Sequence, residues 1–386
     1  MKIRAAVLSE TGLPQPYAQS RPLYLEELEL APPGPGEVLV RIRAAGLCHS
    51  DLSVVNGDRP RPLPMALGHE AAGTVEATGD GVTDLARGDH VILVFMPSCG
   101  HCAPCASGRP ALCEPGAVAN GAGTLLSGAR RLTRVSASAG ASATQPVMQH
   151  HLGCSAFADY AVVSRRSIVP IDRDIPFEHA ALFGCALLTG MGAVINTAKA
   201  EAGSSVAVIG LGGVGFASLL AALASGARQV VAIDRLQSKL DLARSLGATQ
   251  VFNAEDGDVI SQVKAATDGG VDYAFEMAGA VAALELAYRV TRRGGTTVSA
   301  GLPNPHAIWP LQAVSLIAEE RTVKGSYIGS CVPTRDVPRY VALYKAGKLP
   351  LDRLLSEKLA LPEINAALDR LARGESIRQV IVMDAA

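Results

Sequence analysis

The sequence predicts an α/β protein built from a mostly β domain and a doubly wound parallel sheet. Before residue 170 the chain consists of short strands, such as 37–43 and 90–94, separated by turns rich in Pro and Gly. From residue 205 onward, short apolar strands alternate with helical segments, which is typical of a parallel sheet covered on both faces. The length of 386 residues is sufficient for two or three domains.

Composition and charge argue against several classes of protein. Hydrophobic residues make up 48% of the chain and charged residues 18%, with a mean hydropathy of +0.24. The 35 Lys and Arg residues nearly balance the 36 Asp and Glu residues, whereas a nucleic-acid-binding protein usually carries a basic excess. The first residues alternate apolar and polar like a strand and not like a signal peptide, so we expect a cytoplasmic protein.

The uncharged segment 202–227 has the length of a membrane span, but glycines interrupt it. A buried strand, a glycine-rich turn and a buried helix explain it better, so we expect no membrane partner. The segment 115–149 is rich in Ala, Ser, Gly and Thr with little periodicity, and we expect it to be an exposed loop.

The parallel sheet is predicted element by element. Strands are expected at 205–209, 228–233, 250–252, 271–276 and 296–300, and helices at 216–225, 238–246, 259–266 and 280–290. The first strand is followed by a G-x-G-x-x-G motif that includes Gly210, Gly212, Gly213 and Gly215. Such glycines permit a tight turn and let backbone N–H groups approach a pyrophosphate at the helix N-terminus.

An acidic residue completes the dinucleotide signature. Asp234 ends the second strand, nineteen residues after Gly215, where a carboxylate accepts hydrogen bonds from the ribose hydroxyls. Because that carboxylate would repel a 2′-phosphate, NAD is favoured over NADP as the cofactor. Arg235 follows it and is expected to lie against the adenine.

The eight cysteines point to metal chemistry more than to disulfides in a long chain without a secretory signal. Four of them have the spacing of a closed tetrahedral zinc site, in a lobe of about residues 97–115. An iron–sulfur cluster is the alternative, but a ferredoxin run continues with Cys-Pro after three residues, which this chain lacks. The expected structural zinc ligands are Cys99, Cys102, Cys105 and Cys113.

A second set of metal-binding residue types is scattered along the chain. Cys48 lies in Gly-Leu-Cys-His-Ser-Asp, His69 and Glu70 lie in Leu-Gly-His-Glu, and Cys185 follows Phe-Gly. No spacing rule unites them, and a lone Cys or His is usually a core residue or an exposed one. Residue chemistry alone therefore leaves open whether they form one site.

With these motifs placed, the chain from about residue 3 to 383 resembles the zinc-containing medium-chain alcohol dehydrogenases, in their dimeric branch. The segments that carry the resemblance are 46–51, 68–73, 88–91, the four-cysteine lobe, 184–185, the glycine loop and 374–378. The resemblance implies a GroES-like catalytic domain over 1–186 and 328–386, and a Rossmann domain that binds NAD over 187–327. It also implies a homodimer.

The resemblance, and not the spacing, joins Cys48, His69 and Cys185 into a catalytic zinc site, so that two Zn²⁺ are expected per chain. It implies that Glu70 can act as an alternative ligand and that Asp51 supports the histidine. Both roles agree with the general chemistry of catalytic zinc, which keeps an open position and a histidine oriented by a carboxylate or carbonyl.

The implied reaction is alcohol oxidation, in which zinc lowers the pKa of the bound hydroxyl and hydride passes to the nicotinamide. The proton leaves through Ser50. Ser53 stands where the best-known animal enzymes have a histidine that completes the relay, so the exit beyond Ser50 must use water or another group. His49 stands where many relatives have an arginine that faces the pyrophosphate, which predicts weaker and more pH-sensitive NAD binding.

The resemblance implies further contacts with cofactor and substrate. Nicotinamide contacts are expected from Thr189 and Val214, a contact with the adenosine ribose from Lys239, and a pyrophosphate contact from Arg378. An apolar substrate pocket would be lined by Phe95, Leu152 and Leu302, which otherwise are ordinary core residues.

We expect a hydrophobic primary alcohol as substrate, aromatic or allylic, and no nucleic-acid partner. One alternative is an S-hydroxymethylglutathione (formaldehyde) dehydrogenase, but the carboxylates and arginine that bind the glutathione tail have no counterpart in segment 56–63 or after Cys113. The other is a non-catalytic structural relative that keeps the fold, which the intact Cys48, His69 and Cys185 set beside Ser50 disfavours. Zinc-free quinone reductases lack the cysteine lobe, and polyol dehydrogenases usually have Glu as the third catalytic ligand.

Overall fold

The computed structural model describes residues 1–135 and 147–383 and divides into two compact units. The first unit comprises Met1–Cys185, Val332–Pro338 and Leu351–Ala386, and the second comprises Ala186–Cys331 and Arg339–Pro350. The two units are close to the two domains that the resemblance implies. They differ at residue 186, at 328–331 and at 339–350, all of which lie in the second unit. The last difference arises because helix α12 (Pro333–Lys345) begins in the first unit and ends in the second.

The first unit is built from two sheets. One has the order β7-β2-β1-β4-β8, and the other has the order β10-β6-β5-β3-β18-β17, with β9 also paired to β3. Most neighbours are antiparallel. Buried residues alternate with more exposed ones in the first part of β1 and the middle of β3, whereas the last four residues of each strand are all buried. The strands are β1 (Lys2–Leu8), β2 (Leu23–Leu30), β3 (Glu37–Leu47), β4 (Met65–Ala66), β5 (Ala71–Thr78), β6 (His90–Leu93), β7 (Leu132–Arg134), β8 (Gln149–His150), β9 (Tyr160–Ser164), β10 (Ile168–Ile171), β17 (Leu355–Leu359) and β18 (Arg378–Val382).

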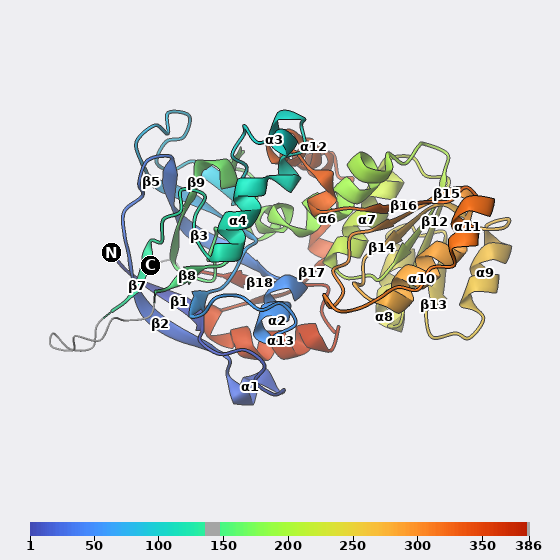
Figure 1. Ribbon diagram of the computed structural model, residues 1–386, viewed down its shortest axis with the longest axis horizontal. Coiled ribbons are helices and arrows are strands. Elements are labelled where there is room, and N and C mark those ends of the chain that lie inside the picture. Colours follow the sequence, from blue (N-terminus) through green and yellow to red (C-terminus); the bar gives the residue numbers. More distant parts are fainter. Residues whose placement is uncertain (136–146, 384–386) are drawn as a thin grey trace. The chain divides into compact units, whose positions relative to one another are not determined.

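The helices of the first unit are short. Helix α13, which has the strongest separation of apolar and polar faces, lies against α1 and α2 (Figure 1). The helices are α1 (Tyr17–Ser20), α2 (His49–Val55), α3 (Ala103–Ala106), α4 (Glu114–Ala122), α5 (Phe177–Ala180) and α13 (Ile364–Ala372).

The segment 115–149 was expected to be an exposed loop, and that expectation is wrong for its first residues, for strand β7 and for the start of β8, where Leu132 and Met148 are buried. Helix α4 occupies Glu114–Ala122, because Cys113 caps it through the backbone N–H of Gly116, and Pro115 suits its first turn. Gly123, with φ +66°, ends the helix in the left-handed region. The expected loop residues 136–146 lie outside the described residues.

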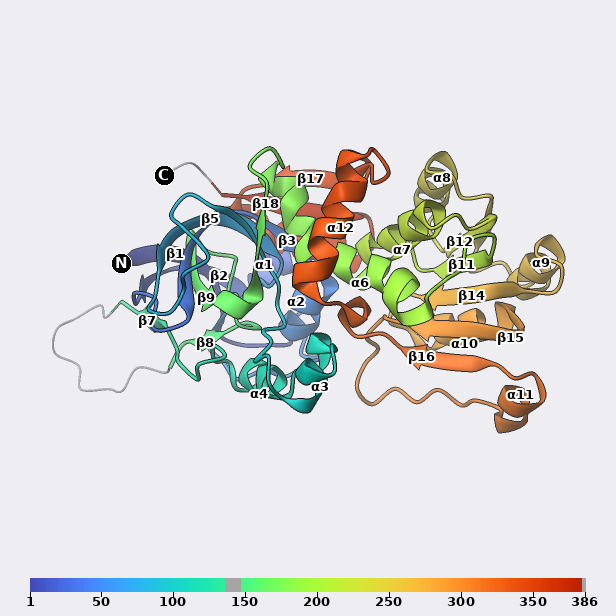
Figure 2. The same ribbon diagram turned by 90° about the horizontal axis from the view of Figure 1, so that it is seen from above.

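The second unit is a six-stranded parallel sheet with the order β13-β12-β11-β14-β15-β16, which Figure 2 shows side by side from β12 to β16. Residues 207, 209, 231 and 233 face a core shared with helices α9 and α10, while 206, 208, 230 and 232 are equally buried on the other face. Because these strands are buried on both faces of the sheet, their sequences are continuously apolar and do not alternate apolar and polar residues. The predicted α/β class, with a mostly β part and a doubly wound parallel sheet, is confirmed.

The bounds of the second unit's elements follow the predicted alternation. The strands are β11 (Ser205–Ile209), β12 (Gln229–Asp234), β13 (Gln250–Asn253), β14 (Val271–Glu276), β15 (Thr291–Ser299) and β16 (Thr322–Gly325). The helices are α6 (Ala186–Gly192) with a π-helical continuation (Ala193–Ala198), α7 (Gly213–Ala224), α8 (Gln237–Ser245), α9 (Val259–Ala266), α10 (Val281–Val290) and α11 (Ala313–Ala318). Among the described residues, no single helix is long and apolar enough to cross a membrane; two short consecutive helices, 177–184 and 186–198, reach that length only together and across a bend.

Candidate metal centres and cofactor site

Four potential metal ligands converge in the interior of the first unit. The ligand atoms of Cys48, His69, Glu70 and Cys185 all lie within 4.8 Å of one another, and all four residues are buried. Cys48 follows β3 and begins helix α2, His69 and Glu70 precede β5, and Cys185 ends the turn Ala181–Gly184. Segments far apart in the sequence therefore supply one cluster.

Strand pairing and close backbone approach bring these residues together. Strands β3 and β5 are antiparallel neighbours with Ala45 opposite Ala71, so the end of β3 and the start of β5 meet at one edge of the sheet. Gly68 has φ +94°, and a side chain there would overlap the backbone of residues 156–157. A side chain at Gly184 would overlap the carbonyl of Leu93 on β6, so only glycine lets the chain carry Cys185 this close to the sheet.

The donor set has the free lone pairs that a metal ion requires. Nδ1 of His69 lies 2.9 Å from Oδ1 of Asp51, while Nε2 of His69 is buried without a hydrogen-bond partner. Burial alone would lower the pKa of His69, but the Asp51 carboxylate raises it well above its usual value and holds the ring in place. An imidazole oriented by a carboxylate, with its other nitrogen unpartnered beside two cysteines, fits a zinc ligand.

The electrostatics of Cys48 also fit a metal ligand. A hydrogen bond from the Cys185 thiol, together with the charge of Arg378, lowers the pKa of Cys48 well below its usual value despite burial. A thiolate is the form in which cysteine binds zinc. Glu70 belongs to the same cluster as Cys48. Burial raises the pKa of Glu70 to about 7, and neither of its carboxylate oxygens has a hydrogen bond.

The second cysteine group forms a separate lobe of the first unit. The sulfurs of Cys99, Cys102, Cys105 and Cys113 lie within 4.8 Å of one another. The backbone N–H groups of Cys99 and Gly116 donate to Cys113, and those of His101 and Cys102 donate to Cys99. N–H donors directed at sulfur stabilise thiolates, and four cysteine ligands fit a structural zinc ion. His101 is exposed and lies outside this ligand set.

Sequence reasoning missed one buried histidine beside the first cluster. Nδ1 of His151 lies 3.4 Å from Oδ1 of Asp51, and its ring meets the ring of His69 edge to face, with centroids 5.5 Å apart. Burial lowers the pKa of His151 well below its usual value. The His-His pair in the sequence was the only available signal, and it carries no spacing that would connect it to Asp51.

The expected relay and pocket residues occupy distinct places. Ser50 lies half-buried in the first turn of α2 beside the exposed His49, and the hydroxyl of Ser53 donates to the carbonyl of Ser50 at 2.9 Å. Phe95 is buried, with its ring edge to face against His69 at 5.3 Å between centroids. Leu152 is also buried in the first unit, whereas Leu302 lies in the second unit after β15 and is 53% exposed there.

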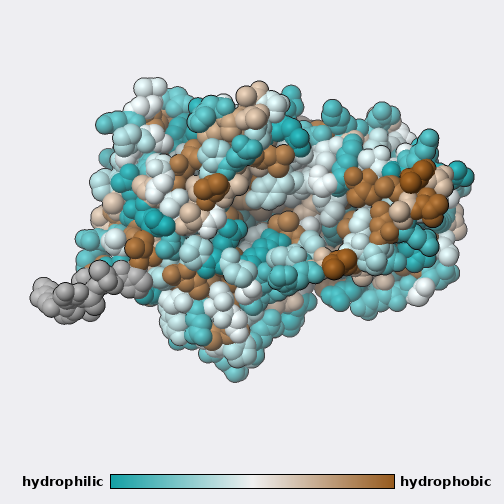
Figure 3. All heavy atoms as spheres, viewed as in Figure 1, coloured by the Kyte–Doolittle hydropathy of each residue, from teal (hydrophilic) through white to brown (hydrophobic). Residues whose placement is uncertain are grey.

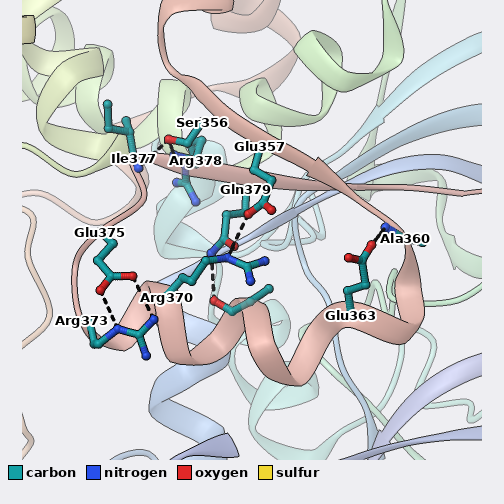
Figure 4. A network of polar contacts seen from close by, with 11 residues as sticks. Ser356, Glu357, Ala360, Glu363, Arg370, Arg373, Glu375, Ile377, Arg378 and Gln379 are labelled. Atoms are coloured by element: carbon teal, nitrogen blue, oxygen red, sulfur yellow. Dashed lines mark hydrogen bonds and ion pairs between the residues drawn. The ribbon is translucent and has the colours of Figure 1, made fainter. Parts of the chain in front are cut away.

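Arg378 is held within the first unit by β18. Its Nη1 donates to the carbonyl of Leu47 at 3.0 Å, and its Nη2 lies 3.4 Å from Oε2 of Glu70. Figure 4 shows how the strand is fixed around it: the hydroxyl of Ser356 accepts from the backbone N–H groups of Ile377 and Arg378, and Arg370 binds Glu357 and Gln379. The structure thus places this arginine next to the potential metal ligand Glu70.

In the second unit, three glycines of the motif, Gly210, Gly212 and Gly215, differ in the space around them. Gly210 has φ +91°, which suits a tight turn, and a side chain at Gly215 would overlap the carbonyl of Gly210. A Cβ at Gly212 would instead meet nothing within 4 Å. The loop therefore packs closely at Gly215 and is open at Gly212. Helix α7 begins just after Gly212, with Gly213 and Val214, so a pyrophosphate at this opening would contact the N-terminus of the helix.

Asp234 connects the end of β12 to this loop. Its Oδ2 accepts from the backbone N–H of Leu211 at 2.6 Å, and its Oδ1 accepts from Leu236 at 3.0 Å. Burial lowers the pKa of Lys239, although the charge of Asp234 opposes this shift. Arg235 is exposed, with Nη1 3.9 Å from Glu255. The carboxylate keeps unused lone pairs that suit ribose hydroxyls.

Thr189 is buried on α6, next to the start of α7. Gly190 allows this approach, because a side chain there would overlap the carbonyl of Val214, and the hydroxyl of Ser218 donates to the carbonyl of Gly190 at 2.9 Å. Thr189 and Val214, which were expected to contact the same ring, therefore lie on neighbouring backbone segments.

Comparisons with known proteins agree with this geometry. Residues 34–173 match the model of the alcohol dehydrogenase GroES-like domain, and residues 213–346 match that of a zinc-binding dehydrogenase. Alcohol dehydrogenase class-3 from Drosophila melanogaster is 38% identical over 371 residues, which cover 95% of each chain. The chain belongs to the zinc-containing medium-chain alcohol dehydrogenases.

Solved structures extend this comparison to the fold. The benzyl alcohol dehydrogenase of Acinetobacter calcoaceticus is 34% identical, with a TM-score of 0.90 and complete coverage of both chains. A zinc-binding dehydrogenase of Sinorhizobium meliloti bound to NADP is 25% identical, with a TM-score of 0.78 over 99% of both chains. This alcohol dehydrogenase is therefore a zinc-dependent oxidoreductase that uses a nicotinamide cofactor, with a GroES-like unit and a Rossmann sheet.

Proposed function

We propose that this dehydrogenase interconverts a hydrophobic primary alcohol, aromatic or allylic, and its aldehyde, with NAD(H) as the cofactor. The observation that supports the proposal most is the buried group of Cys48, His69 and Cys185, in which Nε2 of His69 has no hydrogen-bond partner. Such a donor set leaves a fourth position for substrate.

The residues around this group have complementary roles in the proposed reaction. A zinc ion held by Cys48, His69 and Cys185 would lower the pKa of a substrate hydroxyl and polarise a carbonyl. Asp51 fixes the ring of His69, and Ser50 accepts the proton of the hydroxyl. The hydroxyl of Ser53 donates to the backbone of Ser50, so it does not extend the relay, and the proton leaves by water or another group.

The cofactor preference rests on Asp234. Its two hydrogen bonds to backbone N–H groups hold the carboxylate at the end of β12, where it can accept from ribose hydroxyls and would repel a 2′-phosphate. We propose NAD over NADP on this ground, with Arg378 and His49 at the pyrophosphate. Replacement Asp234→Ala should raise the ratio of NADP-dependent to NAD-dependent kcat/KM, and an unchanged ratio would remove Asp234 as the selector.

The substrate class rests on the apolar surroundings of the metal ligands. Phe95 lies against His69, and Leu152 is buried in the same unit. The name of the Acinetobacter calcoaceticus relative, benzyl alcohol dehydrogenase, supports an aromatic substrate. The four-cysteine lobe would hold the second zinc ion of each chain.

We also propose that the enzyme is a homodimer. All four residues of the edge strand β16 are exposed, and an unpaired edge is a template for pairing with another strand. Exposed apolar side chains accompany it: Ile308, Val314 and Ile317 are each more than 60% exposed, and Figure 3 shows an apolar patch over α11. Analytical ultracentrifugation should give twice the chain mass, and a monomer at micromolar concentration would contradict the proposal.

The proposed reaction is tested by NADH absorbance with a panel of benzyl, cinnamyl and hexyl alcohols and S-hydroxymethylglutathione, each with NAD and with NADP. The expected result is the highest kcat/KM for benzyl or cinnamyl alcohol with NAD, and no turnover in the Cys48→Ala variant. A preference for S-hydroxymethylglutathione would contradict the substrate class. No turnover with any alcohol would favour a structural protein.

A further inference from the structure

Glu276, the last residue of β14, has a fully buried carboxylate in the second unit. The side chain is 1% exposed. Its Oε1 accepts from the backbone N–H groups of Ala278 at 2.8 Å and Gly279 at 2.6 Å, and its Oε2 accepts from the hydroxyl of Ser299 at 2.7 Å. Within the described part of the chain it has no cationic partner, so these three donors alone satisfy it.

The backbone of Glu276 connects the same segments. Its carbonyl accepts from the N–H groups of Ala300 at 3.0 Å and Gly301 at 3.2 Å. A side chain at Gly301 would overlap the backbone nitrogen of Gly279. The loops that leave β14 and β15 therefore touch each other, and both are bound to Glu276.

The loop after β14 also contacts the glycine motif. The N–H of Met277 donates to the carbonyl of Ile209 at 2.8 Å, and a Cβ at Gly210 would lie 2.8 Å from the nitrogen of Ala278. The loops at the carboxyl ends of β11, β14 and β15 are thus in contact with one another. The Glu276 carboxylate connects the loop after β14 with the end of β15.

Strand order assigns these loops to one half of the cofactor, an argument that rests on the proposed NAD binding. Asp234 ends β12 on one side of β11, and Glu276 ends β14 on the other side. Neighbouring strands are about 4.8 Å apart. If the adenosine half lies over β12 and the pyrophosphate at the end of β11, the nicotinamide half must extend over β14 and β15.

We propose that Glu276 is a positioning residue for the nicotinamide half of the cofactor. The carboxylate does not take part in hydride transfer. It fixes the backbone of residues 278–279 and the side chain of Ser299, which border that half of the cofactor, by satisfying N–H and O–H groups that would otherwise lack partners. Removal of the carboxylate releases residues 278–279 and Ser299, while the bonds from Ala300 and Gly301 to the Glu276 carbonyl remain, and it costs affinity for the nicotinamide half alone.

The test compares two ligands on the zinc-loaded, full-length protein. NADH contains both the adenosine half and the nicotinamide half of the cofactor, and its binding is measured by its fluorescence. ADP contains only the adenosine half and two phosphates, and its binding is measured by calorimetry. In Glu276→Ala the Kd for NADH should rise by about tenfold or more, because the variant leaves three donors unsatisfied. The Kd for ADP should stay within about twofold, because the carboxyl ends of β11 and β12 are unchanged.

Two variants provide matched controls. In Glu276→Gln the amide oxygen can accept both N–H bonds while the amide nitrogen donates to Ser299, so the Kd for NADH should return to within about threefold of wild type. In Asp234→Ala, on the adenosine side, the Kd should rise for NADH and ADP alike. If Glu276→Ala does not fold, Ser299→Ala should raise the Kd for NADH alone by about threefold through the loss of one hydrogen bond.

Each contrary outcome has a distinct meaning. Unchanged NADH affinity in Glu276→Ala, or in Ser299→Ala where that variant is needed, would overturn the inference. A parallel loss of ADP affinity would overturn it too, because Glu276 would then support the sheet as a whole. Failure of Glu276→Gln to restore binding would contradict the geometric role. A wild-type protein that binds neither ligand would overturn the proposed function and this inference with it.

Discussion

Oδ1 of Asp51 lies 2.9 Å from Nδ1 of His69, and both residues are completely buried. The other oxygen of Asp51 accepts from the backbone N–H of Cys48 at 3.1 Å. One carboxylate therefore positions two of the proposed zinc ligands, a histidine ring and the backbone of a cysteine. Hydrogen bonds of this kind fix the tautomer of a metal-bound histidine.

We predict that Asp51→Asn lowers the affinity for the catalytic zinc or the turnover by about 10- to 100-fold, because the ring of His69 loses its anionic partner. Zinc release to a chelating indicator and benzyl alcohol oxidation measure the two effects. Asp58→Asn removes an exposed carboxylate a short distance along the chain and serves as the control. Equal zinc retention and turnover in Asp51→Asn and wild type would show that this contact is dispensable.

The four-cysteine lobe yields a prediction about metal content and stability. Cys102→Ser should lose one of two zinc ions per chain and lower Tm by several degrees, since metal-binding free energy contributes to folding. Elemental analysis and calorimetry give the two quantities. His101→Ala changes an exposed residue of the same lobe that lies outside the ligand set, and should keep both ions. An unchanged Tm and metal content in Cys102→Ser would refute a structural zinc site.

His49→Arg should strengthen NAD binding most at alkaline pH. We propose that His49 faces the cofactor pyrophosphate; a guanidinium is charged at every relevant pH, whereas an imidazole is charged only at lower pH. The Kd for NAD at about pH 8 should fall several-fold, and the difference from wild type should narrow at about pH 6. An unchanged Kd at the higher pH would place His49 away from the phosphates.

His150 should make the protein less stable in acid. The side chain is 1% exposed, and its Nε2 accepts from the backbone N–H of Arg131 at 3.0 Å, which requires an unprotonated nitrogen. Burial lowers its pKa to about 4; the charges of Arg130 and Arg131 act in the same direction, while Glu37 opposes them.

The sign of the effect follows from proton binding. In the unfolded chain the pKa of His150 is that of an ordinary histidine, about 6.5. As the pH is lowered below this value, the unfolded chain binds a proton that the folded chain does not, so the free energy of unfolding decreases until the pH reaches the pKa of His150 in the folded chain. The expected loss from about pH 6.5 to about pH 4 is about 3 kcal/mol. Urea unfolding across this range measures it. His150→Gln keeps an acceptor without a titrating group and should flatten the profile, whereas the exposed His306→Gln should not. Identical profiles for His150→Gln and wild type would contradict the role of His150.

Local patterns were sufficient where the functional atoms are close along the chain. The glycine motif and the four-cysteine lobe were assigned from spacing, because one turn or one short loop brings their atoms together. Asp234 was assigned from the strand–helix–strand order, because parallel neighbours β11 and β12 end at the same edge of the sheet. The helix α4 was missed for a different reason. Its sequence of Ala, Gly and Asn has no apolar periodicity, and only the cap from Cys113 and the proline in its first turn reveal where it begins.

The convergence of Cys48, His69 and Cys185 was decided by strand pairing. Their association came from family resemblance, since no spacing connects them, and the antiparallel register of β3 and β5 supplies the physical cause. The His-His pair that includes His151 has no spacing that connects it to Asp51, and Glu276 between two loops carries no sequence signal. A hydrogen bond between residues distant in the chain depends on register and backbone approach, which short-range patterns do not encode.

The amino-acid sequence by itself determined the two-part α/β architecture, the cysteine lobe and the dinucleotide loop, because periodicity, spacing and glycine positions act over a few residues. Only the tertiary structure decided which other buried polar groups meet: His151 with Asp51, Arg378 with Glu70, and Glu276 with Ser299. The physical reason is that a buried polar atom must find a partner wherever the packed strands bring one, and the packing of whole sheets sets those positions.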